Sequence, residues 1–387
     1  MKGILFTSMV LLSALTVHAQ SFYNINSNVF ISAGTTFTVG DSLVNKGTLT
    51  NNGNMVMGGV WINTGTYNPG NGEITFNNPP GGKSQIINHN NQSFNKLTIN
   101  GGGEKLILAD MTVVGELNLV NGVIANQNNS KVIFQSGAKI VGGSDQSHVN
   151  GPVEQQGSGD LYFPMGNGVV YLPVQISGVT DTNVKATITL HELSENETLV
   201  SGDDIIALSS HRYWEFGLTD GLVNGSTLTL PLRNEEALPG DDFQLIVAES
   251  TLPLGEYQSL GQSSFTGTKS DGLVTSEVPP TTTFFTIGVL NDEVSVTVYN
   301  GVSPNDDGLN DYFKLLNIKK FPNNTVTIFN RWGDKVFELS GYDDDTRVFK
   351  GENNLKGSQK LPSGTYFYSI KLGDGTPALT GYLELKN

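Results

Sequence analysis

A six-residue period runs through residues 37–67 and limits what this part of the chain can fold into. One set of positions six residues apart carries glycine, and another set carries a large apolar side chain. The glycines are Gly47, Gly53, Gly59 and Gly65, and the apolar residues are Phe37, Leu43, Leu49, Met55, Trp61 and Tyr67. A six-residue unit cannot bury an apolar face alone, so the units must stack as a solenoid.

The solenoid prediction gives each residue type in the repeat a role. Leu43, Leu49, Met55, Trp61 and Tyr67 are predicted to form the core because they hold the shared period. Glycine allows tight corners, and asparagine side chains can stack in ladders from one coil to the next. Each unit is therefore expected to be one short strand and its turn.

Short β-rich runs continue after residue 69, separated by turns rich in Gly and Asn. They lie at residues 73–76, 94–99, 105–108, 111–120 and 131–134. We therefore predict a β-helix or a closely related β-solenoid over residues 20–148. This stretch resembles the Asn/Gly-rich β-helical regions of bacterial surface adhesins, which implies a role in adhesion.

Longer strands with strict alternation replace the repeat after residue 148. Leu228, Leu230 and Leu232 alternate with Thr227 and Thr229, and residues 184–190 alternate in the same way. Residues 284–289 are predicted to be the last strand of this region. Seven or so strands separated by turns predict two packed sheets over residues 149–293. No segment shows a sustained 3.6-residue period. The predicted fold class is therefore all-β: a β-solenoid, a central β-sandwich, and a small Ig-like β-sandwich over residues 294–387.

Charge is distributed unevenly along the chain. The net charge is -15, and residues 151–294 contain 4 Lys or Arg against 20 Asp or Glu. A strongly acidic surface repels the phosphates of nucleic acids, so we expect no nucleic-acid partner. A solvated surface is the simplest interpretation of the excess acid, and binding of cations or basic partners is the alternative.

Residues 1–19 predict a signal peptide. Lys2 precedes an apolar run that closes with Val17-His18-Ala19 before Gln20. The run is too short to span a bilayer of about 30 Å, and we expect no other segment to span one. The chain has no cysteine. Lipid modification of an N-terminal Cys, disulfides and thiolate chemistry are therefore excluded.

Residues 294–387 carry the most specific motifs. They are SPNDDGLNDYF at residues 303–313, IFNRWG at 328–333, LPSGTYFY at 361–368 and GYL at 381–383. These motifs resemble the gliding motility-associated C-terminal domain family, the type B sorting domain of the type IX secretion system of Bacteroidota. One departure is Phe349-Lys350-Gly351, where the family has Trp-x-Gly.

The resemblance implies that an outer-membrane type IX translocon recognises this domain after Sec export, and that an outer-membrane partner attaches the chain. The location would be the cell surface or the extracellular space. The residues implied in recognition are Pro304, Asn305, Asp307, Gly308, Asn310, Asp311, Arg331, Trp332, Gly333, Gly364 and Tyr366.

The residues of this domain by themselves predict a small β-sandwich. Tyr366, Tyr368, Ile370 and Leu372 are predicted to line one face of a strand, and Phe367, Ser369 and Lys371 the other. Trp332, which precedes a glycine, is expected to fill the core of the domain.

One metal site is a hypothesis at this stage. Ser303, Asn305, Asp307 and Asp311 have the spacing of a calcium loop, and their oxygen atoms suit a hard cation. The alternative is a turn in which Asx side chains accept hydrogen bonds from nearby backbone amides. Calcium should raise the melting temperature of the domain only if Asn305, Asp307 and Asp311 bind it.

The motifs of common hydrolases and nucleotide-binding sites are missing from the sequence. His89, His148, His191 and His211 are scattered, and each is expected to be a surface or sheet residue rather than a ligand. We therefore expect a non-catalytic, adhesin-like protein. The alternatives are a secreted carbohydrate-binding or carbohydrate-active protein, with surface glycans as partners, and an accessory component of the gliding or secretion machinery. An exposed aromatic platform or a carboxylate pair in a groove would favour carbohydrate.

Overall fold

The computed structural model describes residues 3–6, 10–12, 16–78, 84–127, 129–236, 238, 244–290, 296–305, 308–373 and 375–387. The chain forms two compact units, Met1–Asn291 and Asp292–Asn387. Strands account for nearly all regular structure in these residues, and the helical segments are single 3₁₀ turns, η1 (Asn234–Glu236) and η2 (Ile318–Lys320). The predicted all-β fold class is confirmed.

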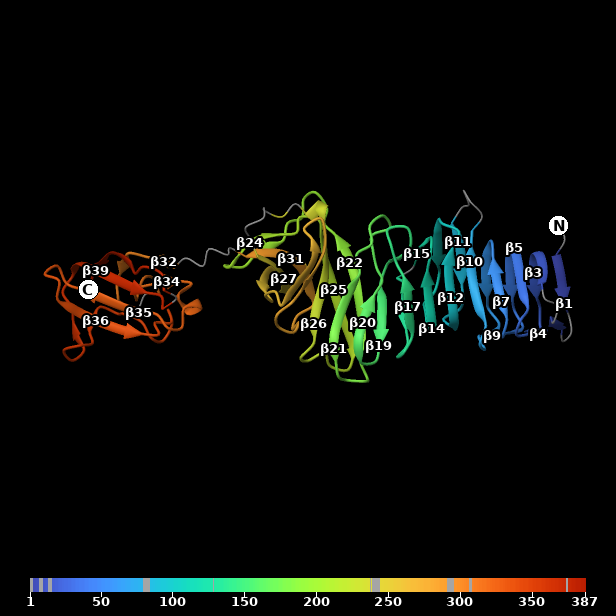
Figure 1. Cartoon of the computed structure of the whole chain (residues 1–387), viewed down its shortest axis with the longest axis horizontal. Coiled ribbons are helices and arrows are strands. Elements are labelled where there is room, and N and C mark those ends of the chain that lie inside the picture. The colour runs from blue at the N-terminus through green and yellow to red at the C-terminus, as the bar shows by residue number, and fades with distance from the viewer. Residues whose placement is uncertain are drawn as a thin grey trace. The chain divides into compact units, whose positions relative to one another are not determined.

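Parallel strands stack to form the β-solenoid of the first unit, and Figure 1 shows β5, β7, β10 and β12 side by side in chain order. The strands are β1 (Gly3–Phe6), β2 (Val10–Leu12), β3 (Thr16–Asn24), β4 (Asn28–Ile31), β5 (Thr36–Asn45), β6 (Thr48–Asn51), β7 (Asn54–Met57), β8 (Val60–Asn63), β9 (Thr66–Asn68), β10 (Glu73–Asn77), β11 (Gln85–Asn88), β12 (Ser93–Asn100), β13 (Glu104–Ile107), β14 (Met111–Leu119), β15 (Val123–Asn126), β16 (Val132–Phe134), β17 (Lys139–Gly142), β18 (Val149–Asn150) and β19 (Val153–Gln156).

Three six-residue units complete one coil where the repeat is regular. Thr36 pairs with Asn54, Ser42 with Val60, and Thr48 with Thr66, so neighbouring coils are eighteen positions apart. Each unit contributes one side of the coil, and the same side is used again three units later. The six-residue period of the sequence is therefore one third of the structural repeat.

The residues that hold the apolar period form the solenoid core, as predicted. Leu43, Leu49, Met55 and Trp61 are fully buried, and Tyr67 is 6% exposed. The indole of Trp61 packs edge-on against the ring of Tyr67, with centroids 5.7 Å apart. Aromatic pairs of this geometry add to the stabilisation that comes from burial alone.

Glycine is required at the corners because the coils approach each other closely. A Cβ added to Gly59 would lie 1.6 Å from the carbonyl oxygen of Asp41, and one added to Gly65 would lie 2.1 Å from that of Gly47. Neither Gly59 nor Gly65 has a positive φ. Space between coils, rather than a left-handed backbone, excludes a side chain at these positions.

The predicted asparagine ladder is present. Asn24 Nδ2 donates to Asn45 Oδ1 at 2.7 Å, and Asn45 Nδ2 donates to Asn63 Oδ1 at 2.6 Å. All three side chains are fully buried. Each side-chain amide therefore donates a hydrogen bond to the asparagine of the next coil. These hydrogen bonds offset the free-energy cost of burying the polar groups.

Residues 1–19, the predicted signal peptide, overlap β1, β2 and the start of β3. In the structure β1 pairs in parallel with β3, and Gly3 is opposite Ser21. Strand β3 continues through the predicted cleavage site between Ala19 and Gln20. Cleavage at that site stays a prediction.

Antiparallel strands follow the solenoid and share its core. Strand β19 pairs in parallel with β16 on one side and antiparallel with β22 on the other, so one sheet continues from the solenoid into the sandwich. The strands of the sandwich are β20 (Gly159–Phe163), β21 (Val174–Val179), β22 (Lys185–Glu192), β23 (Val200–Ser201), β24 (Ile205–Leu208), β25 (Arg212–Asp220), β26 (Thr227–Arg233), β27 (Gln244–Ser250), β28 (Glu256–Ser259), β29 (Ser264–Thr268), β30 (Asp271–Thr275) and β31 (Phe284–Leu290).

The sandwich has two antiparallel layers. One contains β22, β25, β31, β27 and β28, and the other is ordered β20-β21-β26-β30-β29. Leu228, Leu230 and Val274 of the second layer belong to the same apolar cluster as Phe285 of the first. The cluster also includes Phe22 and Leu49. The core is therefore continuous from the solenoid to the sandwich.

The second unit has its own core and a five-stranded sheet ordered β33-β40-β39-β35-β36. Its strands are β32 (Thr297–Val298), β33 (Gly301–Val302), β34 (Leu315–Leu316), β35 (Thr325–Phe329), β36 (Lys335–Ser340), β37 (Glu352–Asn353), β38 (Gln359–Lys360), β39 (Gly364–Lys371) and β40 (Leu379–Leu385). Tyr366, Ile370 and Leu372 are buried, as predicted, and Phe367 on the opposite face is 48% exposed.

Candidate recognition surface

The loop between β33 and β34 is held together by the carboxylate of Asp311. One oxygen of this carboxylate accepts the backbone N–H of Gly308 at 2.8 Å, and the other accepts that of Asn305 at 3.3 Å. Gly308 and Asn310 have positive φ values of 85° and 54°. These contacts are those of an Asx-capped turn, the alternative to a calcium loop.

The calcium site stays a prediction. Asp307 lies outside the described residues, so the structure does not describe all three predicted ligands, Asn305, Asp307 and Asp311. Across the part of the chain that the structure describes, no three His, Cys, Asp or Glu side chains are grouped so as to hold a metal ion.

The turn between β35 and β36 contains three of the predicted recognition residues, Arg331, Trp332 and Gly333. Asn330 Oδ1 accepts the backbone N–H groups of Trp332 and Asp334, each at 2.9 Å, and Gly333 has a φ of 85°. These bonds fix a tight turn. The guanidinium of Arg331 lies over the ring of Trp332, 4.9 Å from its centroid, which is a cation–π contact.

The prediction that Trp332 fills the core is wrong, because its side chain is 77% exposed. The residue lies in the turn rather than in a strand, and the Asn330 bonds direct it outward. Phe349 fills the core instead. It is fully buried and packs edge-on against Phe337, with ring centroids 5.0 Å apart. The Phe349-Lys350-Gly351 motif therefore keeps a core aromatic where the resemblance has Trp.

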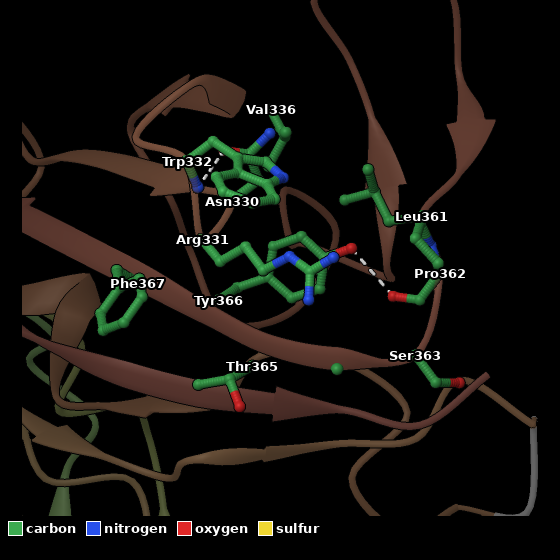
Figure 2. A pocket seen from close by; sticks show the side chains of 11 residues that line it. Asn330, Arg331, Trp332, Val336, Leu361, Pro362, Ser363, Thr365, Tyr366 and Phe367 are labelled. Carbon is green, nitrogen blue, oxygen red and sulfur yellow. Dashed lines mark hydrogen bonds between the residues drawn. The ribbon is translucent and has the colours of Figure 1, made fainter.

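A hollow of about 770 Å³ lies beside this turn, between residues 330–332, residues 361–363 and the start of β39. Figure 2 shows Arg331 and Trp332 on one side of it, and Tyr366 with its hydroxyl bonded to the carbonyl of Pro362 at 2.8 Å. The described residues of its lining include the cation Arg331 and no Asp or Glu. Its surface thus combines aromatic rings with a positive charge, a composition common at protein interfaces.

Exposed aromatic residues continue from the hollow across the outer face of the sheet. Phe367 of β39 is opposite Tyr382 of β40 on one side and opposite Phe329 of β35 on the other. Phe367 is 48% exposed and Tyr382 is 53% exposed. Residues directly opposite on one face of a sheet are close enough to form a continuous surface.

The structure divides the predicted recognition residues into two groups. Arg331, Trp332, Gly364 and Tyr366 line the hollow, and Gly333 completes the turn that carries the first two. Pro304, Asn305, Gly308, Asn310 and Asp311 belong to the loop after β33 and do not line the hollow. Tyr382 was not among the predicted recognition residues. Its alternation with Leu383 in the last strand indicated that its side chain faces outward.

The histidines of the first unit serve packing and local hydrogen bonds. His89 is 2% exposed and accepts the Trp61 indole N–H at 3.0 Å through Nδ1. Burial lowers the pKa of His89 to about 3, so the ring is neutral. His191 Nε2 lies 2.8 Å from Glu215 Oε2, and burial lowers the pKa of His148. Trp61 and Trp214 are both buried, so neither forms an exposed platform.

The second unit is thus a small all-β domain with its own core and an exposed aromatic face. Residues 296–385 match the family model for the CHU_C Type IX secretion signal domain. The match identifies this part of the chain as a type IX secretion sorting signal, and it implies engagement with the type IX machinery and export to the cell surface or the extracellular space.

Neither a curated protein nor a solved structure matches the chain significantly. Within the described residues, no helix has the length and apolar character needed to cross a membrane.

Proposed function

We propose that this chain is a non-catalytic, adhesin-like protein of the cell surface or extracellular space. In this proposal the first unit is the exported cargo and the second unit is its sorting signal. The match of residues 296–385 to a secretion signal carries the proposal. The solenoid supports it, because stacked coils present an extended surface suited to binding other surfaces.

A carbohydrate-binding role is the alternative, and it has less support. Stacking on sugars requires exposed aromatic side chains, whereas the two tryptophans of the first unit, Trp61 and Trp214, are buried. The purified full chain is expected to adhere to host-cell or abiotic surfaces and to release no product from polysaccharides. Selective binding to one glycan on an array, lost when that free glycan is added, would favour the alternative.

We also propose that the secretion machinery contacts the hollow beside Trp332. Trp and Arg are the residues most often responsible for binding energy at interfaces, and here Arg331 and Trp332 stack on each other in an exposed, rigid turn. The turn bonds of Asn330 hold both side chains in place before a partner arrives, which lowers the entropic cost of binding.

Replacing Trp332 with Ala is expected to lower export by about tenfold or more, because an interface tryptophan contributes roughly 2 kcal/mol or more. The stability of the domain should change by only about 0.5 kcal/mol, since the side chain is exposed. Surface and periplasmic fractions of the full chain measure the effect. Leu355→Ala is the matched control, because Leu355 is also exposed, at 47%, and does not line the hollow. If both variants were exported equally, the hollow would not be part of the recognition surface.

A further inference from the structure

One edge of the five-stranded sheet of the second unit is open. The backbone N–H of Glu384 donates to Asn300 O at 2.7 Å and that of Lys386 to Val302 O at 2.9 Å, so these groups point from β40 toward β33. Because backbone direction alternates along a strand, the N–H and C=O groups of Thr380 and Tyr382 point the same way. Strand β33 pairs only with Glu384 and Leu385.

Residues 296–300, the described residues directly before β33, do not pair with the rest of this edge. Val298 pairs with Leu315 of β34, and the Tyr299 N–H donates to Lys314 O at 3.1 Å. The chain therefore turns toward β34 before it reaches Thr380 and Tyr382. No other described strand pairs with β40 on that side. Among the described residues, none forms a backbone hydrogen bond with the two N–H and two C=O groups of Thr380 and Tyr382 that face this side.

The opposite edge of the same sheet is closed by side chains. Asn354 Oδ1 accepts the Glu338 N–H of β36 at 3.0 Å, and Asn354 Nδ2 donates to Glu338 O at 2.8 Å. The guanidinium of Arg347 donates to Ser340 O, further along β36. Natural sheets protect their edges in such ways because an unprotected edge pairs with other chains.

The open edge lacks two of the usual kinds of protection, a charged residue and a proline within the unpaired segment. Its sequence is Leu379-Thr380-Gly381-Tyr382, without a charge or a proline. Thr380 is exposed, and Tyr382 is 53% exposed and lies beside Phe367 on the outer face. An added strand would therefore place a side chain next to Tyr382 and extend the aromatic surface by one strand.

We propose that β40 binds an extended polypeptide segment of the secretion machinery by strand addition along Leu379–Tyr382. The inference rests on the proposed function, because the segment belongs to the secretion machinery. It adds the mode of binding, which is the addition of a strand to the sheet. Backbone hydrogen bonds from Thr380 and Tyr382 hold it, and the Tyr382 ring selects an apolar neighbour. The match of residues 296–385 to a secretion signal favours a segment of the machinery over a second copy of this chain, and the oligomeric state of the chain distinguishes the two.

Thr380→Pro tests the proposal. Proline removes the outward N–H of Thr380 and leaves the bonds between β40 and β39 intact, since Thr380 and Ser369 are opposite each other but not hydrogen-bonded. In cells with the secretion system, export of the full chain is expected to fall about tenfold. Thr380→Val keeps the N–H and is expected to be exported normally. Thr380→Lys, which keeps the backbone and adds an edge charge, is a second variant that should also reduce export.

Amide hydrogen exchange on the purified full chain checks the edge directly. The Thr380 and Tyr382 amides are expected to exchange fast, and the Gly381 and Leu383 amides, which bond to β39, slowly. Slow exchange at Gly381 and Leu383 in Thr380→Pro would show that the variant is folded. Slow exchange at Thr380 and Tyr382 in the unmodified chain would mean that the edge is covered, and would overturn the proposal.

The other outcomes separate the strand-addition proposal from the proposed function. Normal export of Thr380→Pro and Thr380→Lys, together with loss of export when the chain ends at Glu293, overturns strand addition and leaves the sorting role standing. Export of the chain that ends at Glu293 overturns both. A dimer in light scattering that Thr380→Pro converts to monomer would assign the edge to a second copy, against the proposal.

Discussion

Leu49→Asp is expected to destabilise the first unit by about 4 kcal/mol or more. Leu49 is fully buried in β6, opposite Val29 of the coil before and Tyr67 of the coil after. The substitution removes a buried apolar side chain and also places a carboxylate where water cannot reach it. Both effects weaken the coils on either side as well, because each coil is stabilised mainly by its two neighbours.

The measurement is denaturant unfolding of the purified full chain, followed by far-UV circular dichroism. Asn68→Asp is the matched control, since it introduces the same carboxylate at an exposed position of β9, opposite Thr50. The control should unfold at nearly the same denaturant concentration as the unmodified chain, whereas Leu49→Asp should unfold at a much lower one. Coincident curves for Leu49→Asp and the unmodified chain would contradict the solenoid core.

The repeat made the solenoid predictable, because one period fixed both the core and the corners. Leu49 and Trp61 could be assigned to the core without knowing how many units make a coil. The eighteen-residue coil depends on the pairing of Thr36 with Asn54, which a six-residue period does not specify. The glycine corners were predicted for their backbone freedom, and the structure gives close approach between coils as the reason, as at Gly59.

The sandwich strands were also predictable from alternation, but the continuous core was not. The junction depends on β19, which pairs with both β16 and β22. The buried ion pair between Arg212 and Glu236, with Nε and Oε1 2.9 Å apart, likewise left no mark in the sequence. Such contacts join positions that are separate in sequence, and local periodicity carries no information about them.

At the recognition surface, the sequence located the motifs but not the direction of their side chains. Trp332 was assigned to the core because large aromatic residues are usually buried. Its exposure follows from its place in a turn that the Asn330 side chain closes, a local hydrogen-bond pattern that the core prediction did not take into account. The open edge at Thr380 depends on where the chain before β33 turns away, and a single strand sequence cannot reveal that.

Residues 294–387 are expected to be sufficient to carry a passenger across the outer membrane. These residues nearly coincide with the second compact unit, whose apolar core is separate from that of the first. A passenger can therefore replace the first unit while the apolar core of the second unit stays complete. The predicted leader, residues 1–19, brings a chain only as far as the periplasm.

The most direct measurement places a fluorescent protein between a signal peptide and residues 294–387 and follows it in a strain that has the type IX secretion system. The reporter is predicted to reach the cell surface or the medium. A matched fusion, in which the reporter follows the chain ending at Glu293, is predicted to stay in the periplasm. If both reporters reach the surface equally, or neither does, residues 294–387 are not the sorting signal and the second unit is another adhesive module.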